Sequence, residues 1–458
     1  MRAEAETVVT AATPERPGLH NAMPPYRLWA LGAVAAVLTV VAPFAFRASG
    51  DNAYIGLALL TGLVALAATG VAQRTSERAA LWTIALVAIG LRIYLLFTEP
   101  LLSTDIYRYV WDGIVQGAGI NPYRYFPAHE ALSFLRDNPV YPNINRADYA
   151  VTIYPPVAQM FFFLATRLGA NIVMMKLALL VCEAVTVLMI VLLLRRLGRP
   201  STHIVAYAWH PLPLWEIANN GHIDALMVSF LMVGLWLAAT HRPLRAGAAI
   251  ALSALVKPFA LVALPAIWRP WDWRLPLIVV AVMLLCYALY LSVGSGVLGF
   301  LTRGYLTEEE LSTGQSVWPL AAIQWIFGIH AWNDVWVYLT ISAAVLAALA
   351  LRTAFRTESS TVTMLTDVSH LLMAFLLLLS PNYPWYFLAL TPFVALLGGA
   401  PVWALTVGAI VLQDEVHWDP SLPAMVRKTV LYAGFFAACS CYAAWRARRI
   451  RDERRIDP

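Results

Sequence analysis

The sequence predicts an all-α, polytopic integral membrane protein with about twelve membrane-spanning helices. Of the 458 residues, 60% are hydrophobic and only 13% are charged, whereas soluble domains carry about 25% charged residues. Apolar runs of roughly 18 residues recur along the chain, which is the length that crosses hydrocarbon as a helix. No stretch between these runs is long enough for a separate soluble domain. We therefore expect one membrane domain over residues 27–446.

The two ends of the chain are polar. Residues 1–26 contain proline and mixed charge, which predicts a disordered cytoplasmic segment. The first apolar run, 28–46, is too long for the core of a signal peptide, so we interpret it as an uncleaved span. Residues 447–458 form a basic tail that we expect in the cytoplasm. The net charge of +5 follows from basic loops and this tail, a topological signal that does not indicate nucleic-acid binding.

Twelve apolar runs are predicted as spans: 28–46, 54–72, 80–97, 172–194, 202–217, 222–240, 275–293, 332–351, 363–380, 384–398, 401–413 and 427–446. Two further runs, 154–168 and 244–267, contain Pro155-Pro156 and Lys257-Pro258. Proline removes helix hydrogen bonds, so we interpret both runs as re-entrant or broken elements. Membranes tolerate such elements only where protein or a water-filled cavity surrounds them.

The charges predict which loops face the cytoplasm. With twelve crossings and a cytoplasmic N-terminus, the basic segments 73–78, 195–199, 241–245, 268–274, 352–356 and 446–455 all lie inside. The opposite side then carries the loops 98–171, 218–221, 294–331, 381–383 and 414–426. The loop 98–171 is the longest of these, and the unusual polar residues gather on this extracytoplasmic side.

The long loop begins with an acidic and aromatic segment, "DIYRYVWD", from Asp105 to Asp112. Helical spacing would place Asp105, Arg108, Tyr109 and Asp112 on one face. An interfacial amphipathic helix with aromatic anchors is the alternative interpretation. The segment is therefore a candidate site that needs support from elsewhere in the chain.

Three other polar segments supply that support. His210, Glu216 and His222 lie at membrane depth, where ionisable groups indicate function; Asp224 there also suits the first turn of a helix. Lys257 lies between two apolar half-helices and should point into a cavity or pair with an anion, the alternative being that it extends to the cytoplasmic surface. The segment "SPNYPWY", 380–386, is either part of the site or an aromatic belt.

Together the segments "TDIYRYVWDG…GINPY", "HPLPLWEIANNGHIDAL", "ALVKPFALVALP" and "SPNYPWYFLALTP" resemble the polyprenol-phosphate-sugar-dependent glycosyltransferases of the GT-C superfamily. The similarity covers roughly residues 80–400 and is greatest to bacterial mannosyltransferases that use polyprenyl-phosphate mannose. It implies a GT-C-like fold in the bacterial inner membrane, with transfer of a sugar to a lipid or glycan acceptor. The superfamily's catalytic base corresponds to Asp105, with Asp112 as the fallback because Thr104 precedes Asp105 where some members have a second acid.

The chemistry of this reaction needs one carboxylate, because a lipid phosphate leaves as an anion without a proton from the enzyme. An aspartate is ionised at neutral pH and accepts the proton of the acceptor hydroxyl. The donor phosphate is assigned to Lys257, Arg108, Arg124 or Arg303 on charge-assisted hydrogen-bonding grounds. The remaining assignments are His222, Asp224, Tyr383, Trp385 and Tyr386 to the donor, and Tyr107, Trp111, Asn121, Tyr123 and Glu216 to the acceptor.

We expect no metal and no cofactor, and as partners only the polyprenyl-phosphate sugar, the acceptor and membrane lipids. Two other functions stay open. A lipid-linked sugar flippase or transporter would also contain broken helices and intramembrane charges, although the two halves show no internal repeat. A polysaccharide polymerase would use similar donors but predicts a long loop in the second half. Arabinose, glucose or galactose could replace mannose, and the acceptor, linkage and oligomeric state are not predicted.

Overall fold

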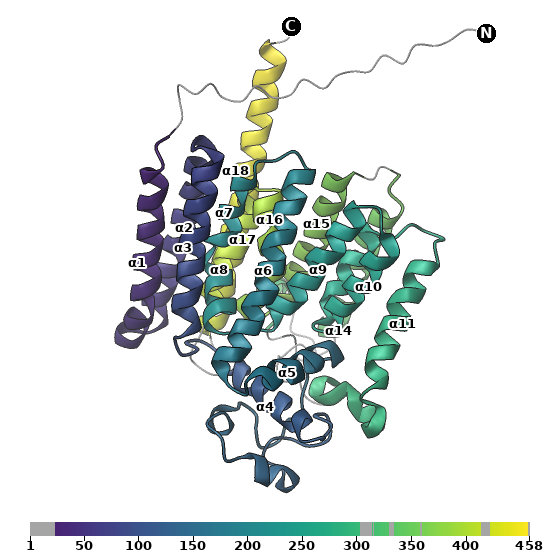
Figure 1. The fold of residues 1–458 in the computed structure, drawn as a ribbon. Coiled ribbons are helices and arrows are strands. Elements are labelled where there is room, and N and C mark those ends of the chain that lie inside the picture. The colour runs from purple at the N-terminus through teal and green to yellow at the C-terminus, as the bar shows by residue number, and fades with distance from the viewer. Residues whose placement is uncertain are drawn as a thin grey trace, which may run out of the picture.

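The computed structural model describes residues 23–302, 314, 316–328, 334–357, 360–413 and 422–456, with side chains left out at 300–302, 422–424 and 450–456. Every regular element in these ranges is helical, and the helices form a bundle with roughly parallel axes (Figure 1). This confirms the predicted all-α class. Within the described ranges, six helices are long and apolar enough to cross a membrane: α1 (Tyr26–Ser49), α2 (Asp51–Arg74), α3 (Glu77–Leu96), α6 (Ile172–Arg196), α14 (Asp334–Ala354) and α15 (Thr361–Leu379).

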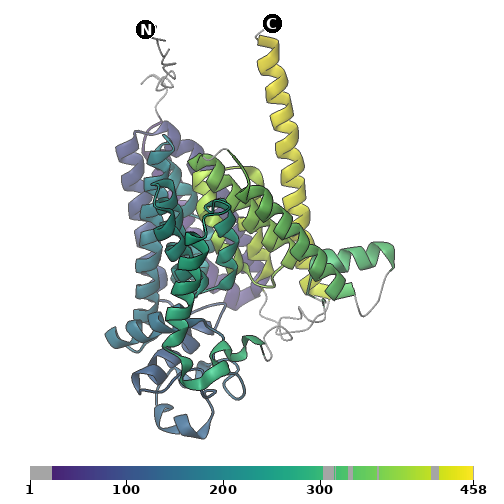
Figure 2. The same ribbon diagram turned by 90° about the vertical axis from the view of Figure 1, so that its right-hand side faces the viewer.

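The other predicted spans are shorter, bent or less apolar. They correspond to α9 (Asp224–Ala239), α11 (Arg274–Ala288), η8 (Pro384–Leu390) with α16 (Thr391–Leu396), α17 (Ala400–Gly408) with η9 (Ala409–Leu412), and α18 (Leu422–Ile456). The helix α11 bends by 112° into η7 (Leu291–Thr302), and α13 (Trp318–Phe327) precedes α14. The count of twelve crossings stays a prediction. Figure 2 shows α18 extending past one end of the bundle.

Large apolar side chains cover the outside of the bundle. Leu285 is 72% exposed, Leu284 is 66% exposed and Val37 is 61% exposed. An aqueous protein rarely presents apolar surface on this scale. A hydrocarbon environment around the bundle accounts for this exposed apolar surface, as expected for a membrane protein.

The run 202–217, predicted as one span, is not a regular helix. It divides into η4 (Ser201–Ile204), α7 (Val205–Ala208), α8 (Pro211–Pro213) and the π-helical η5 (Leu214–Asn219). The cause is local: Pro211 and Pro213 lack the N–H groups that a continuous helix needs. The segment is almost wholly buried, with Trp209 and Trp215 at 0% and 1% exposure. Protein therefore surrounds its irregular backbone, as a membrane requires.

The break predicted at Lys257-Pro258 is present. The helix α10 (Pro243–Ala254) ends before it, Lys257 has extended backbone angles, and the 3₁₀ helix η6 (Pro258–Ala266) follows. The carbonyl of Leu255 accepts a hydrogen bond from Val157 N at 3.1 Å. The break therefore lies against α5 (Pro156–Leu168), which belongs to the long loop 98–171.

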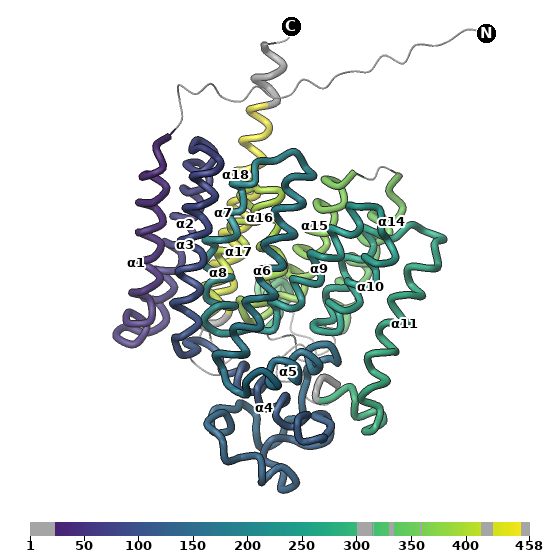
Figure 3. Tube along the Cα trace, in the orientation of Figure 1, coloured from purple at the N-terminus to yellow at the C-terminus, as the bar shows by residue number. Residues whose placement is uncertain are grey.

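That loop folds into a layer of its own below the bundle, visible in the Cα trace (Figure 3). It contains α4 (Asp105–Gly117), the short helices η2 (Glu130–Leu135) and η3 (Tyr141–Asn143), and α5. The helices α4 and α5 pack closely because Gly113 has no side chain: a Cβ there would lie 2.4 Å from the Phe162 carbonyl oxygen. Tyr109 stacks on the Phe162 ring at 4.6 Å between centroids. This packing fixes the orientation of α4, whose first residue is Asp105.

Candidate active site

Asp105 lies at the first turn of α4 with its carboxylate in contact with two other segments. Its Oδ1 accepts a hydrogen bond from Asn145 Nδ2 at 2.8 Å, and its Oδ2 lies 3.9 Å from His222 Nδ1. The side chain keeps 21% of its surface exposed. The N-terminal end of a helix carries a partial positive charge, which stabilises a carboxylate there. Asp105 is thus an oriented and accessible proton acceptor.

Three buried polar side chains hold the connection that leads from α3 to Asp105. Lys176 Nζ donates to two carbonyl groups at the C-terminal end of α3, at 2.7 and 3.3 Å. Asn219 and Asn220 accept hydrogen bonds from successive backbone N–H groups of the connection, at 3.0 and 3.1 Å. Helix ends leave such backbone groups without partners unless side chains supply them. The position of Asp105 therefore depends on α6 and η5 as well as on α4.

His222 links Asp105 to a second carboxyl group. Its Nε2 lies 3.2 Å from Glu216 Oε2, and Asn220 Nδ2 donates to the same oxygen at 3.1 Å. Both His222 and Glu216 are 1% exposed. Glu216 lies in the π-helical turn of η5, and π turns of this kind occur frequently at functional sites. His222 therefore lies between one buried carboxyl and one accessible carboxyl.

Aromatic rings from the second half of the chain cover His222. Its ring stacks on Trp385 with centroids 4.1 Å apart, and Trp385 stacks on Tyr383 at 4.3 Å with an interplanar angle of 6°. Both aromatic residues come from the start of η8. The two stacking contacts join His222, Trp385 and Tyr383 into one aromatic wall beside Asp105.

Lys257 is held at the helix break by an acidic and an aromatic residue. Its Nζ lies 2.7 Å from Asp224 Oδ2 and 4.6 Å from the centroid of the Tyr386 ring. Asp224 is wholly buried at the start of α9, and the Lys257 side chain is 15% exposed. Asp224 Oδ1 has no hydrogen-bond partner among the described residues. Lys257 therefore points into the protein, and the alternative in which it extends to the cytoplasmic surface does not describe this structure.

Asp112 and Arg108 form a separate buried network. Arg108 Nε donates to Asp112 Oδ1 at 2.8 Å, and Gln159 Nε2 donates to Asp112 Oδ2 at 2.8 Å. Arg108 and Asp112 are 5% and 2% exposed. Gln159 also donates to Thr152 Oγ1 at 2.7 Å. The network joins α4 to α5, and both oxygens of the Asp112 carboxylate already accept hydrogen bonds within it.

Three further candidates from the long loop contact the segment after α11. Asn121 Nδ2 donates to the carbonyl of Tyr290 at 2.9 Å and to Ser292 Oγ at 2.9 Å. Arg124, which is exposed, donates to the carbonyl of Ser292 at 3.3 Å. Tyr123 donates within the loop to the carbonyl of Tyr154 at 2.6 Å, and its ring packs edge-on against Tyr290 with centroids 5.4 Å apart. Burial raises the pKa of the Tyr123 phenol, so it stays a donor. These contacts fix the loop against η7.

The last three candidates lie apart from the Asp105 cluster or outside the described residues. Tyr107 donates to Glu99 Oε2 at 3.5 Å; partial burial, followed by the charge of Glu99, raises the pKa of its phenol. Trp111 is 1% exposed and packs against Tyr141 with centroids 5.3 Å apart. Arg303 lies outside the described residues.

Asn145 and Lys176 are among the residues of this arrangement that were not predicted from the sequence. Asn145 comes from an irregular part of the loop, 40 residues after Asp105, and no local pattern marks it. Lys176 lies within an apolar run and is wholly buried. Its charge in such a run was a usable signal, since ionisable residues at membrane depth need partners.

Nothing in the described part of the chain groups three or more His, Cys, Asp or Glu side chains as a metal would require. The prediction that no metal takes part stays untested. The arrangement as it stands offers one accessible carboxylate, one partly accessible ammonium group and an aromatic wall between them.

Comparison with known proteins assigns the chain to a family. The sequence profile of a family described as alpha-(1->6)-mannopyranosyltransferase, N-terminal domain, matches residues 22–272, more than half of the chain. The chain belongs to this family. The matched region of this mannosyltransferase-family protein contains Asp105, Glu216, His222 and Lys257, and it ends before the aromatic residues of η8.

Two curated relatives carry the name alpha-(1->6)-mannopyranosyltransferase A. The protein from Mycobacterium tuberculosis is 27% identical over 185 residues, which is 39% of this chain and 34% of the relative. The protein from Corynebacterium glutamicum is 26% identical over 203 residues, 43% of this chain and 40% of the relative. The mannosyltransferase-family chain therefore aligns with well under half of the length of either relative. No solved structure matches it.

Proposed function

We propose that the protein is a membrane glycosyltransferase that moves a sugar, most simply mannose, from a polyprenyl-phosphate carrier to a lipid or glycan acceptor. Family membership supports the class of reaction, and the two relatives named as alpha-(1->6)-mannopyranosyltransferases support mannose. Asp105 is the general base of this reaction. The proposal places about twelve crossings around the site, in the plasma membrane of a bacterium.

The observation that carries the proposal is an unbroken set of contacts from Asp105 to Lys257. Asp105 lies beside His222, His222 stacks on Trp385, and Trp385 neighbours Tyr386, whose ring lies under Lys257. A proton acceptor and a cation thus lie at the two ends of one aromatic wall. An inverting transfer needs the base and the phosphate-binding cation on opposite faces of the reacting sugar carbon.

The proposed reaction is a single displacement with inversion at the sugar carbon. The acceptor hydroxyl transfers its proton to the Asp105 carboxylate while its oxygen forms a bond to that carbon. The bond from the same carbon to the phosphate oxygen breaks, and polyprenyl phosphate leaves with both electrons. No acid is needed for this leaving group, so one carboxylate suffices. His222 and Asn145 are positioning residues that orient Asp105.

Lys257, held in place by Asp224, binds the donor in this scheme. Lys257 stabilises the phosphate by a charge-assisted hydrogen bond, and its contact with Asp224 aims the ammonium group. Asp224 is wholly buried, so in this scheme it acts on the donor through Lys257 and makes no direct contact with the sugar. Arg124 at the rim of the long loop supplies a second cation for the phosphate.

The proposed site faces the extracytoplasmic side. The layer that contains Asp105 lies at one end of the bundle, and the C-terminal end of α2 and the far end of α18 lie at the other (Figure 1). The basic residues that end α2, α6 and α14 support a cytoplasmic location for that other end. A lipid-linked donor suits the opposite side, where nucleotide sugars are not expected.

The test uses the purified full-length chain in lipid vesicles with radiolabelled polyprenyl-phosphate mannose and a membrane lipid extract as acceptor. The expected result is release of polyprenyl phosphate with formation of a labelled glycolipid or glycan. Asp105→Asn should lower the turnover by about 100-fold or more, because it removes the general base. Asp137→Asn, at an exposed aspartate of the same loop, is the matched control and should keep parental turnover.

Three outcomes would contradict the proposal. Parental turnover in a folded Asp105→Asn variant would exclude this residue as the base. Movement of the carrier across the vesicle membrane without sugar transfer would favour a flippase. Repeated addition to one growing chain, with a ladder of products, would favour a polymerase.

A further inference from the structure

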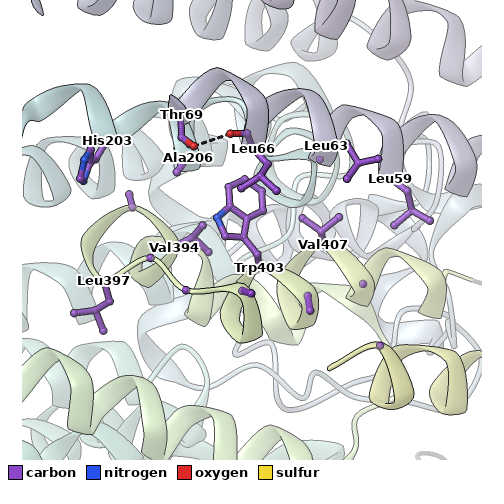
Figure 4. Close-up of a pocket in the computed structure, with 18 of the residues that line it drawn as sticks. Leu59, Leu63, Leu66, Thr69, His203, Ala206, Val394, Leu397, Trp403 and Val407 are labelled. Atoms are coloured by element: carbon purple, nitrogen blue, oxygen red, sulfur yellow. Dashed lines mark hydrogen bonds between the residues drawn. The ribbon is translucent and has the colours of Figure 1, made fainter. Parts of the chain in front are cut away.

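A crevice of about 640 Å³ lies far from Asp105, between α2 and the segment from α16 to α17. Figure 4 shows α2 along one side, α17 along the other, and Trp403 pointing into the space between them. The two helices touch at one end of the crevice, where a Cβ on Gly62 would lie 2.6 Å from Val407 Cγ1. Away from that contact they separate, and the turn at Gly398–Gly399 borders the other end. The volume is in the range of about 300–1,000 Å³ that binds small organic molecules.

The two ends of the crevice differ in polarity. Leucine, valine, alanine and glycine line most of its length, together with Trp403. Its polar lining residues, Gln73, Arg199 and His203 among them, gather at the end of α2 opposite the Asp105 layer. Gln73 Nε2 lies 3.1 Å from His203 Nε2. Among the described residues, the Arg199 guanidinium donates only to the carbonyl of Leu396. One guanidinium group with unused donors therefore lies at the mouth of an apolar space.

The crevice opens sideways. Leu63 and Leu66 on its rim are 61% and 45% exposed, and these residues belong to the long apolar helix α2. In a membrane this opening faces hydrocarbon. An occupant must therefore be a molecule of the bilayer with an apolar chain and a head at the depth of the helix ends.

We propose that this crevice binds one acyl chain of an anionic phospholipid, with the lipid phosphate at Arg199. The acyl chain lies along Trp403 toward the contact between Gly62 and Val407. Basic pockets between membrane helices near the cytoplasmic surface bind anionic head groups in this way. The site is distinct from the sugar-transfer site at the opposite end of the bundle and does not depend on the identity of its substrates.

The experiment measures lipid retention by native mass spectrometry. The purified full-length protein is equilibrated with phosphatidylglycerol or with phosphatidylcholine of the same acyl chains. The expected result is retention of one phosphatidylglycerol, with a preference of about fivefold over phosphatidylcholine for a single arginine contact. Arg199→Gln should abolish the preference. Ala404→Phe, which fills the crevice, should lower retention of both lipids.

Matched controls separate the crevice from the general surface. Arg195→Gln changes an exposed arginine at the end of α6, and Ala344→Phe changes an exposed alanine on α14; neither lines the crevice. Both controls should retain phosphatidylglycerol as the parent does. Should Ala404→Phe fail to fold, Leu63→Trp at the exposed rim provides the second filling variant.

Equal retention of the two phospholipids by the parent protein would overturn the proposal. Unchanged retention in the filling variants would do the same, since it would place the lipid elsewhere. Displacement of phosphatidylglycerol by a lower concentration of polyprenyl phosphate would also count against it, because the crevice would then be a carrier site.

Discussion

Lys257 Nζ lies 2.7 Å from Asp224 Oδ2 and joins the break after α10 to the first turn of α9. Asp224 is wholly buried, and among the described residues Lys257 is the cation paired with it. Breaking one side of a buried ion pair costs more than removing both partners. The pair therefore has a structural effect that must be separated from any role in binding the donor.

Lys257→Met is expected to lower the free energy of unfolding by about 3–5 kcal/mol, because it leaves the Asp224 carboxylate uncompensated. The double variant Lys257→Met with Asp224→Asn should recover most of that loss. Thermal unfolding in detergent measures both effects. A stability of the double variant as low as that of Lys257→Met would show that the ion pair is not the source of the loss.

The same double variant also tests phosphate binding. If Lys257 binds the donor phosphate, the double variant should be stable and yet show a KM for the donor raised by at least about tenfold, the effect of losing a charge-assisted hydrogen bond. Initial rates over a range of donor concentrations give this value. A parental KM in the stable double variant would leave Lys257 with a structural role alone.

His222→Phe is expected to keep the stacking on Trp385 and to lose the contacts with Asp105 and Glu216. Turnover should fall by about 10- to 100-fold, less than the loss expected from removing the base itself. Combined with Asp105→Asn, it should add little further loss, because residues that act together are not additive. Full additivity in this double-mutant cycle would contradict a positioning role for His222.

Asn145→Asp should change the pH dependence of the reaction. A second carboxylate beside Asp105 disfavours its ionised form, and the base acts only when ionised. The acid limb of the activity profile should therefore move to higher pH, by about one unit. Asn143→Asp, at an exposed asparagine of the same loop, is the control and should leave the profile unchanged.

The variant Asp112→Asn tests whether Asp112, the fallback residue, is the general base in place of Asp105. It breaks the buried pair with Arg108 and should lower the free energy of unfolding by about 3–5 kcal/mol. Turnover per folded molecule should stay of the same order as in the parent, because the Asp112 oxygens already accept from Arg108 and Gln159. Loss of turnover without loss of stability would instead identify Asp112 as the base.

Much of the fold follows from local patterns in the sequence. The helices α1, α2, α3 and α6 coincide with the first four predicted spans to within a few residues, because apolar length alone sets them. The break at Lys257-Pro258 follows from proline. Prolines also cause the irregular course of 201–219, but the apolar length of this run made it look like one continuous span in the sequence. The π-helical turn of η5 has no signature in residue types.

The candidate site could be predicted only in part. The segments that supply Asp105, His222, Trp385 and Lys257 all stand out as polar or aromatic residues in an apolar chain, and the structure brings them together. Helical spacing places Arg108 and Asp112 on one face, and the structure shows that they pair with each other, which occupies the two groups that the sequence assigned to the donor phosphate and to the fallback base. Asn145 depends on the path of an irregular loop, which no periodicity describes.

Trp385 stacks on His222 but lies beyond residue 272, where the match to the family profile ends. A polypeptide cut after residue 272 would retain Asp105, Glu216 and Lys257 but would lack the ring that covers the imidazole, and also the Tyr290 and Ser292 groups that anchor Asn121. The recognisable half is therefore not an autonomous module. Exchange of C-terminal halves between homologues should therefore succeed only when the residues on both sides of these two contacts are exchanged together.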